Sequence, residues 1–365
     1  MTHDPGLASW LQLTLTPGLG ASTIRGLLQK FGLPVAVLAM TRAELAAHAS
    51  PAALEALHSD AVRQSVERAL DWLAGPERAL VTLADDTYPR ALLEIADPPP
   101  VLYAQGRLGL LQHPSLAIVG SRNATAQGAA NAESFARALS DAGLTIVSGL
   151  ALGIDAAAHR GGLAGASSTI AVLGTGMDIV YPRRNVDLAA EISARGLLLS
   201  EFPLGTAAAT HNFPRRNRLI SGLSRGCLVV EAALASGSLI TARAAAEQGR
   251  EVFAIPGSIH SPLSKGCHAL LKAGARLVES ADDVLSELSG FRRSAHASTT
   301  TAAPVPDVAG LLAHMGHDPV GVDSLCMRAG LSSEQVSSEL LRLELDGRVA
   351  ALPGGLYQRL EKAGH

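Results

Sequence analysis

The chain has 365 residues, of which 47% are hydrophobic and 17% charged, and this balance excludes a largely disordered protein and predicts two or three folded domains. Its formal net charge of −3 excludes a general basic field, so any site for a polyanion must be a local concentration of basic residues. Function must therefore be inferred from where residues stand along the chain.

Residues 1–75 are predicted to form a helical domain. Helices are expected on both sides of the turn Thr16-Pro-Gly-Leu-Gly20, and the second one stops at Gly32. Helix-hairpin-helix modules use such a turn to offer backbone N–H groups to a phosphate. The segment carries 6 acidic and 5 basic residues, so we favour an accessory helical domain over a DNA-contacting one.

The segment 76–290 is predicted to be the largest domain, an α/β unit built on a doubly wound parallel sheet. Two short strands at 79–83 and 101–104 are separated by proline-containing segments and are expected at an edge of the sheet. Apolar runs then alternate with helical stretches, which is typical of parallel strands with helices on both faces. Strands are predicted at 116–120, 145–148, 169–173, 197–200, 228–231, 252–255 and 275–278, and helices at 129–142, 156–164, 186–195, 240–248 and 267–272.

Beyond this unit, Ser, Thr, Ala and Pro dominate 291–306, which is typical of a linker. Residues 307–365 follow with the pattern of three helices and a hairpin, and predict a winged helix. The segment has 8 acidic and 5 basic residues, and its expected recognition helix is acidic. Because a helix that enters a DNA groove needs the opposite charge, we favour a protein ligand for this domain.

The three cysteines, Cys227, Cys267 and Cys326, lie far apart and form no Cys-x-x-Cys motif, which argues against disulfides or a thiolate zinc site. The chain starts without a signal-peptide pattern and contains no run of about 20 apolar residues. We therefore expect a cytoplasmic protein with reduced thiols and no membrane contact.

Glycine and serine cluster where the predicted strands end. In a parallel sheet these corners share one edge, where glycine lets a backbone approach a ligand and hydroxyl and N–H groups bind anions. No Gly-x-Gly-x-x-Gly motif is complete, because Ile179 stands where the last glycine belongs, and no P-loop occurs. These motifs therefore indicate no nucleotide, although they do not exclude a nucleoside phosphate, and no cofactor is predicted. The candidate binding residues at these corners are Gly120, Ser121, Arg122, Ser148, Gly149, Gly174, Gly176, Ser236, Gly237 and Ser238.

Arginine is concentrated near the same edge. The window 202–230 contains no Asp or Glu but four arginines, and two more follow the third predicted strand of the alternation. This pattern favours a groove along a phosphate backbone, and the alternative is a solvated helix with unpaired arginines. The candidate contacts are Arg183, Arg184, Arg215, Arg216, Asn217 and Arg218.

Several apparent catalytic or metal motifs are discounted. Ser224 lies in Gly-x-Ser-x-Gly, but a helix precedes it and a strand follows, the reverse of a nucleophile elbow. Asp155 and His159 are interpreted as structural partners beneath a loop, and Glu231 as a carboxylate that holds the 236–241 loop rather than as a base. His314 and His317 lack a third ligand, so no metal site is predicted.

Six ordered motifs together resemble the DNA-processing protein A family, also called DprA or Smf. They lie between residues 120 and 258. The motifs are Gly-Ser-Arg at 120–122, Ser-Gly-Leu-Ala-x-Gly-Ile-Asp-x-x-Ala-His at 148–159, Gly-x-Gly-x-Asp-x-x-Tyr-Pro at 174–182, Phe-Pro-x-Arg-Asn-Arg at 213–218, Ser-Gly-Ser-Leu-Ile-Thr-Ala at 236–242 and Ile-Pro-Gly-Ser at 255–258.

The resemblance implies an extended Rossmann-like fold that binds single-stranded DNA without turnover, forms homodimers and loads RecA during natural transformation. It assigns DNA contacts to Arg122 and Arg183 and to the 216–218 stretch. This chain departs from some relatives at Thr210 and Ala235, where a basic residue is common, and Arg215 and Arg184 are potential replacements. The alternative hypothesis is a nucleotide phosphoribohydrolase on a related scaffold, and the region 263–275 is a candidate dimer face.

Overall fold

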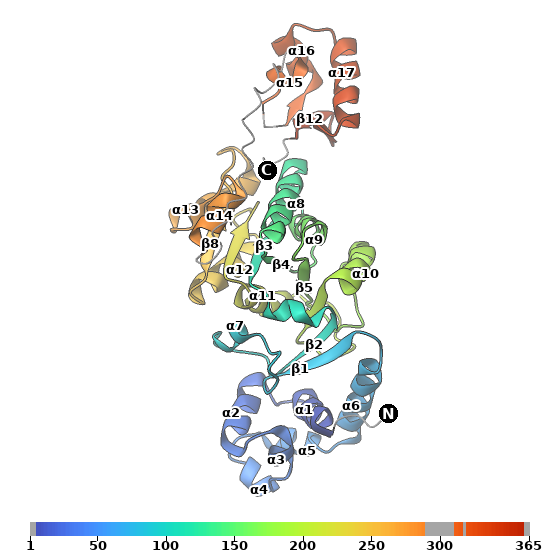
Figure 1. Cartoon of the computed structure of the whole chain (residues 1–365), viewed down its shortest axis with the longest axis vertical. Coiled ribbons are helices and arrows are strands. Elements are labelled where there is room, and N and C mark those ends of the chain that lie inside the picture. Colours follow the sequence, from blue (N-terminus) through green and yellow to red (C-terminus); the bar gives the residue numbers. More distant parts are fainter. Residues whose placement is uncertain (1–4, 289–309, 317–318, 361–365) are drawn as a thin grey trace.

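The computed structural model describes residues 5–288, 310–316 and 319–360. Figure 1 shows a bundle of short helices at one end, a large sheet with helices on both faces in the middle, and a small winged-helix fold at the other end. The predicted linker 291–306 and His317 lie outside the described residues.

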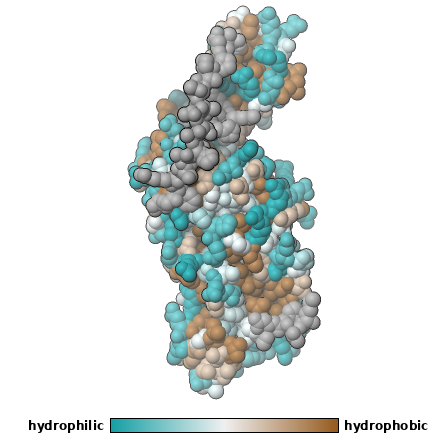
Figure 2. Space-filling model, in the orientation of Figure 1, coloured by the Kyte–Doolittle hydropathy of each residue, from teal (hydrophilic) through white to brown (hydrophobic). Residues whose placement is uncertain are grey.

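Six short helices form the N-terminal bundle, as the sequence predicts. Between the first two, Gly18 has a φ of 85°, and a Cβ added there would lie 3.3 Å from the Cβ of Ala53, so the turn fits glycine best. The bundle has a core of its own, which includes Leu13, Ile24 and Val37. Figure 2 shows apolar side chains gathered over this lower end of the molecule. The helices are α1 (Pro5–Leu15), α2 (Ala21–Phe31), α3 (Pro34–Leu38), α4 (Arg42–Leu45), α5 (Pro51–Ala56) and α6 (Asp60–Leu73).

The central sheet has nine strands in the order β1-β2-β6-β5-β4-β3-β7-β8-β9. As predicted, β1 and β2 form an edge and pair antiparallel, whereas β3 to β9 pair parallel. The strands are β1 (Arg78–Thr82), β2 (Val101–Gly106), β3 (Ser115–Val119), β4 (Thr145–Ser148), β5 (Thr169–Val172), β6 (Leu197–Ser200), β7 (Gly226–Val229), β8 (Glu251–Ala254) and β9 (Arg276–Leu277).

The strand order reverses at β3, which has β4 on one side and β7 on the other. The chain runs from β3 outward to β6, then crosses back to β7 and continues outward to β9. Loops that leave β3 and β7 therefore diverge to opposite faces of the sheet. Such a switch point leaves a crevice at the carboxyl ends of the strands, where ligands of α/β proteins bind.

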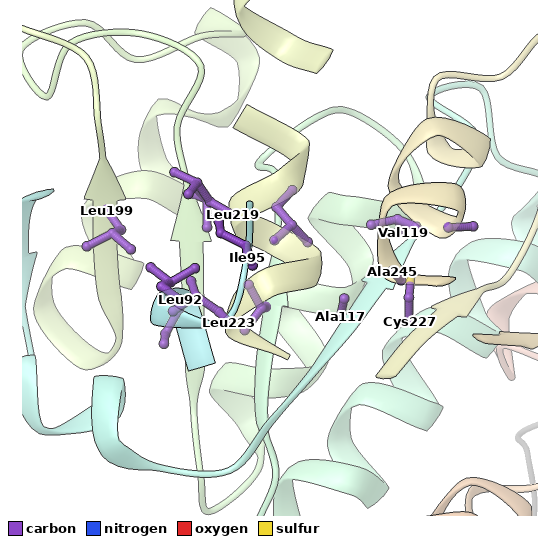
Figure 3. Packing of buried hydrophobic residues seen from close by; sticks show 14 of the residues in the cluster. Leu92, Ile95, Ala117, Val119, Leu199, Leu219, Leu223, Cys227 and Ala245 are labelled. Carbon is purple, nitrogen blue, oxygen red and sulfur yellow. The ribbon is translucent and has the colours of Figure 1, made fainter. Parts of the chain in front are cut away.

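Alternate residues along each strand are buried on opposite faces of the sheet. Leu116 and Ile118 of β3 pack on one face, and Ala117 and Val119 on the other, as the period of two along a strand requires. Figure 3 shows the second of these cores, where Leu219 packs from a helix toward the sheet. The helices are α7 (Arg90–Leu93), α8 (Ala126–Asp141), α9 (Ile154–Ala164), α10 (Val186–Arg195), α11 (Asn212–Leu223), α12 (Ser238–Glu247), α13 (Lys265–Lys272) and α14 (Ala281–Glu287), with 3-10 turns η1 (Leu108–Gln112), η2 (Arg183–Asn185) and η3 (Pro262–Ser264).

The C-terminal elements form a winged helix, as predicted. Its last helix, α17, exposes 59% of Leu341 and 81% of Leu345, and its Arg342 is paired with Glu339. An acidic and apolar face of this kind does not suit DNA. The elements are α15 (Leu311–His314), β10 (Val320–Gly321), α16 (Val322–Ala329), α17 (Ser333–Leu345), β11 (Val349–Leu352) and β12 (Leu356–Arg359), with sheet order β10-β12-β11.

The cysteines agree with the sequence prediction. Cys227 and Cys267 are free and buried, and Cys326 is free and half-buried. Among the helices that the structure describes, none is long and apolar enough to cross a membrane.

Candidate nucleic-acid interface

A groove of about 590 Å³ lies at the switch point, between the loops that leave β3 and β7. The charged side chains that line it are Arg122, Asp155 and Arg216. The full lining is Val119, Gly120, Ser121, Arg122, Asn123, Ala151, Asp155, Tyr181, Thr210, Phe213, Pro214, Arg216, Asn217, Ile220, Ala233, Ala235, Ser236, Gly237, Ser238, Ile240, Thr241 and Leu263.

The corner after β3 directs Arg122 into this groove. A Cβ at Gly120 would lie 2.6 Å from Cγ1 of Ile154 and 2.8 Å from the carbonyl oxygen of Glu231, so the close approach there requires glycine. The next residue, Ser121, is buried, and its N–H donates to the Glu231 carbonyl at 2.7 Å. The backbone just before Arg122 is therefore held in place, while the Arg122 side chain is exposed.

The Arg122 guanidinium lies over an aromatic ring instead of against a carboxylate. Its Cζ is 5.5 Å from the centroid of the Phe213 ring. No acidic residue pairs with Arg122 in the part of the chain that the structure describes. Because Asp155 and Arg216 offset each other, Arg122 supplies the net positive charge of the groove lining.

Two aromatic residues in the groove were not among the predicted contacts. The rings of Tyr181 and Phe213 lie 5.6 Å apart, and Tyr181 is 47% exposed. An exposed ring beside an arginine is a surface on which a nucleobase can stack. Each aromatic directly precedes a proline in a motif of the sequence, and this was the signal that could have identified them.

The opposite wall is the start of α12, where Ser236, Gly237 and Ser238 all line the groove as predicted. The Ser236 and Ser238 hydroxyls lie 2.7 Å apart, and the Ser238 N–H donates to Ser236 Oγ at 3.3 Å. Asn217 reaches across from α11, with its Nδ2 3.5 Å from the Gly237 carbonyl. No acidic side chain occupies the first turn of α12, so this helix end is suited to an anion.

Ser148 and Gly149 lie beneath the groove and not on its surface, contrary to the expectation of a direct contact. The Ser148 hydroxyl is buried and donates to the Ile118 carbonyl at 2.7 Å, because the strand end is enclosed by its neighbours. The Gly149 N–H donates to Asp155 at 3.1 Å. These two residues shape the loop that supports the groove.

Arg216 is largely an internal group. It is 4% exposed, and its Nη1 donates to the carbonyl of Gly149 at 2.7 Å and to that of Val172. Burial lowers the pKa of its guanidinium to about 10, and the Asp155 carboxylate opposes this shift. Burial also raises the pKa of Asp155 above its ordinary value, against the effect of Arg216. Arg216 therefore holds the ends of β4 and β5 together at the groove floor.

Asp155 and His159 are structural, as the sequence analysis favoured. Leu150 has a φ of 57°, and its N–H donates to His159 Nε2 at 3.2 Å. His159 Nδ1 lies 2.8 Å from Thr169 Oγ1. Asn185 adds a donor to the Leu150 carbonyl at 2.8 Å. The loop after β4 is thus fixed by hydrogen bonds on several sides.

The buried His159 predicts a pH-dependent stability. Burial, together with the Arg216 charge, lowers the pKa of His159 to about 3, whereas an unfolded histidine titrates near 6.5. Between these values only the unfolded chain binds the proton, so the stabilisation is complete above pH 6.5 and is lost as pH falls toward 3. We expect His159→Gln to weaken this dependence by about 1.4 kcal/mol per pH unit. Urea unfolding at several pH values measures the free energy of unfolding of the variant and of the wild type, both of which keep Asp155. If the free energy changed with pH equally in the two proteins, the prediction would be wrong.

Arg215 and Arg218 are paired with an acidic residue, contrary to the expected acid-free arginine cluster. Glu201 immediately precedes the acid-free window, and its Oε2 accepts from Arg215 at 3.3 Å and from Arg218. Arg218 also donates to the backbone carbonyl of Asp97 at 2.6 Å. Burial raises the pKa of Glu201, although both arginines act to lower it. The window 202–230 contains no acidic residue in the sequence, but in the folded structure Glu201 lies against two of its arginines.

The remaining predicted contacts lie around the groove and do not line it. Gly174 is buried under Phe213, whose Cδ1 would lie 2.8 Å from an added Cβ, and Gly176 donates to the Thr206 carbonyl at 3.0 Å. Arg183 and Arg184 are exposed in η2, just past Tyr181. The roles of Arg183 and Arg184 in DNA contact stay predictions.

Glu231 holds a loop, but not the predicted one. Its two carboxylate oxygens accept from the Thr125 N–H at 2.9 Å and the Thr125 hydroxyl at 2.6 Å, so it fixes the start of α8 instead of the 236–241 loop. The Ser224 hydroxyl is buried and donates to the Ile220 carbonyl, as befits a helix end. No group of three potential metal ligands occurs among the described residues.

Two family models match the chain. Residues 79–289 match the DNA recombination-mediator protein A model, and residues 295–355 match the DprA winged helix domain. Protein Smf of Escherichia coli (strain K12) is 45% identical over 314 residues, covering 83% of each chain. DNA processing protein DprA of Streptococcus pneumoniae is 50% identical over 206 residues, which is 56% of this chain and 73% of that protein.

Solved structures of similar proteins share the fold. The X-ray structure of DNA processing protein A from Streptococcus pneumoniae aligns with a TM-score of 0.65 and 38% identity, covering 79% of this chain and 99% of that one. The protein of that name from Helicobacter pylori, studied for its single-stranded DNA binding mode, aligns with a TM-score of 0.51 and 32% identity, covering 56% and 93%.

Proposed function

Because the chain belongs to the DNA recombination-mediator protein A family, also called DprA or Smf, we propose that it binds single-stranded DNA without catalytic turnover and passes the strand to RecA in natural transformation. The observation that supports this most directly is the switch-point groove, in which Arg122 stands without a carboxylate partner beside Phe213 and Tyr181. A phosphate and a base can be held there together.

The groove chemistry favours binding that does not depend on base sequence. Arg122 offers a charged fork to a phosphate, and the start of α12 with Asn217 offers further donors. Tyr181 offers a face to any base, since every base has one. Next to the groove, η2 with Arg183 and Arg184 adds two exposed arginines.

Titration of a labelled single strand at several salt concentrations tests the proposal. Phosphate contacts release counterions, so the affinity is expected to fall with salt by a slope of about 0.7 per contact on a logarithmic plot. Oligonucleotides of every sequence are expected to bind, because all of them present the same phosphate backbone. An affinity that does not change with salt would overturn the proposed groove.

The alternative function, a nucleotide phosphoribohydrolase, requires a carboxylate near the groove. Asp155 is tied to the Gly149 and Ala151 N–H groups, and Glu231 has both oxygens engaged by Thr125. Release of adenine from AMP would favour this enzyme, and we expect none.

We propose further that the protein is a cytoplasmic homodimer. Leu234 and Ile259 are each 66% exposed. They line an apolar hollow beside α13 that extends into the predicted region 263–275. Leu270 and Leu271 of that region pack partly on the core, so the exposed pair is the better candidate face.

Ile259→Asp is expected to dissociate the dimer, because a charge would be buried in an apolar interface. Analytical ultracentrifugation measures the change, with Leu33→Asp as a control on the 60% exposed Leu33 of the helical bundle. An Ile259→Asp protein that sediments like the wild type would exclude this face.

We propose that the chain is divided into a helical domain at 1–75, a DNA-binding domain at 76–290, a linker at 291–306 and a winged-helix domain at 307–365. The acidic and apolar face of α17 favours a protein ligand for the last part.

A further inference from the structure

A second cavity, of about 210 Å³, lies between the helical bundle and the edge of the sheet. One wall is the turn of the bundle, with Leu19, Gly20 and Ile24, and the other is Pro99 and Pro100 before β2. The space is smaller than that of ordinary drug-sized sites and suits a single small ring system. Its walls are apolar on two sides.

Two buried polar side chains that line this cavity have an atom without a hydrogen-bond partner. Tyr103 is 1% exposed and the Glu201 side chain 2%, and neither Tyr103 Oη nor Glu201 Oε1 is bonded within the described structure. Leaving such groups unpaired is costly, and a site built to receive a polar ligand is one reason for them. Glu201 Oε2 is already engaged by the two arginines of α11, so Oε1 is the free acceptor.

The cavity and the groove meet at the start of α11. Arg215 lines the cavity and is 53% exposed, whereas Pro214 and Asn217 of the same helix line the groove. A strand that leaves the groove across the exposed first turn of α11 therefore passes the mouth of the cavity.

We propose that this cavity receives one base of the bound single strand and favours bases that carry an exocyclic amino group. This inference rests on the proposed function and adds a base-selective subsite to it. The amino group donates to Glu201 Oε1, Tyr103 Oη donates to a ring nitrogen or carbonyl of the same base, and Pro99 and Pro100 cover its face.

The Glu201 carboxylate and the Tyr103 hydroxyl together set the selectivity. Cytosine presents an amino group at its 4-position and an acceptor nitrogen at its 3-position, whereas uracil presents a carbonyl and an N–H there. The two bases have the same size and stacking face. Oligo(dC) and oligo(dU) of equal length therefore probe the subsite with little change elsewhere.

We expect the wild type to bind oligo(dC) about fivefold more tightly than oligo(dU), the amount that one buried hydrogen bond supplies. Tyr103→Phe removes the hydroxyl that donates to the ring nitrogen of cytosine, and it is expected to lower this ratio by weakening oligo(dC) binding. Its melting temperature is expected to stay the same or rise, because an unpartnered buried hydroxyl is lost.

A second variant fills the cavity. Gly20 has a φ of −76° and nothing within 4 Å of an added Cβ, so Gly20→Leu is tolerated by the backbone and projects into the space. Gly26→Leu is the matched control, since Gly26 lies in the same helix, is exposed and is equally open but lines no part of the cavity. We expect Gly20→Leu to abolish the preference and Gly26→Leu to retain it.

The outcomes separate the subsite from the groove. If the wild type binds neither oligonucleotide, the proposed function fails together with the subsite. If both oligonucleotides bind and the ratio in Tyr103→Phe and Gly20→Leu equals that of the wild type, the groove stands and the subsite is overturned.

Discussion

Arg122→Glu is expected to lower the affinity for single-stranded DNA by about 10- to 100-fold, without loss of the folded structure. The guanidinium lies over Phe213 with no carboxylate partner among the described side chains, so its loss breaks no ion pair. In the complex it would contact a phosphate, and a charge-assisted contact of about 1.4–2.8 kcal/mol corresponds to that factor. Reversing the charge adds repulsion to the lost contact.

The matched control for this variant is Arg243→Glu. Arg243 is exposed on α12, the helix whose start lines the groove, but it does not itself line the groove. It changes the net charge of the protein by the same amount, so the difference between the two variants isolates the local contact. Fluorescence anisotropy with a labelled strand measures both. If both variants lost the same affinity for the strand, only the overall charge of the protein would matter for binding, and the groove assignment would be wrong.

Arg216→Met is expected to lower the free energy of unfolding by about 3–5 kcal/mol, the cost typical of leaving a buried charge uncompensated. The variant leaves the Asp155 carboxylate buried without its cation and removes the donor from the Gly149 and Val172 carbonyls. Methionine keeps much of the volume, so the loss reflects charge and hydrogen bonds. Urea denaturation at pH 7 provides the measurement.

The deficit of Arg216→Met is expected to shrink at lower pH. Without Arg216 the folded Asp155 carboxyl binds a proton more readily than the unfolded one, so protonation of the folded state removes the uncompensated charge. Arg183→Met is the control, because Arg183 is exposed and such changes alter stability by about 0.5 kcal/mol or less. A deficit in Arg216→Met no larger than this control would show that the buried Arg216 does not stabilise the fold.

These two arginines, with Arg218, show how far residue pattern alone can reach. The sequence placed all three at the carboxyl edge of the sheet, and the structure places all three near it. Of the three, Arg122 alone has neither a carboxylate nor a carbonyl partner among the described residues, because Gly120 and Ser121 direct it outward over the Phe213 ring. Arg218→Glu, which the pattern would choose as a DNA-binding variant, is expected to disturb the Glu201 pair and therefore the fold.

The arrangement of elements was predictable because hydrophobic periodicity and glycine corners are local signals. The strands at 145–148 and 197–200 and the helix at 186–195 agree residue by residue with the structure. The helix α14 was not predicted, although Ser280 and Asp283 form a capping box at its start. A short helix with few apolar residues gives a weak periodic signal.

The sequence by itself determined the fold class, the chain order of most strands and helices, the corner at 120–122 as part of the groove lining, and the structural nature of Asp155 and His159. These features depend on residues that are near one another along the chain. Only the tertiary structure decided which charges remain available to a ligand. Pairing of Glu201 with Arg215 and Arg218, enclosure of Ser148, and the cavity that joins Tyr103 to the turn at Gly20 all depend on contacts between distant segments. Electrostatic compensation acts through space, so an acid-free stretch of sequence does not by itself make a basic surface.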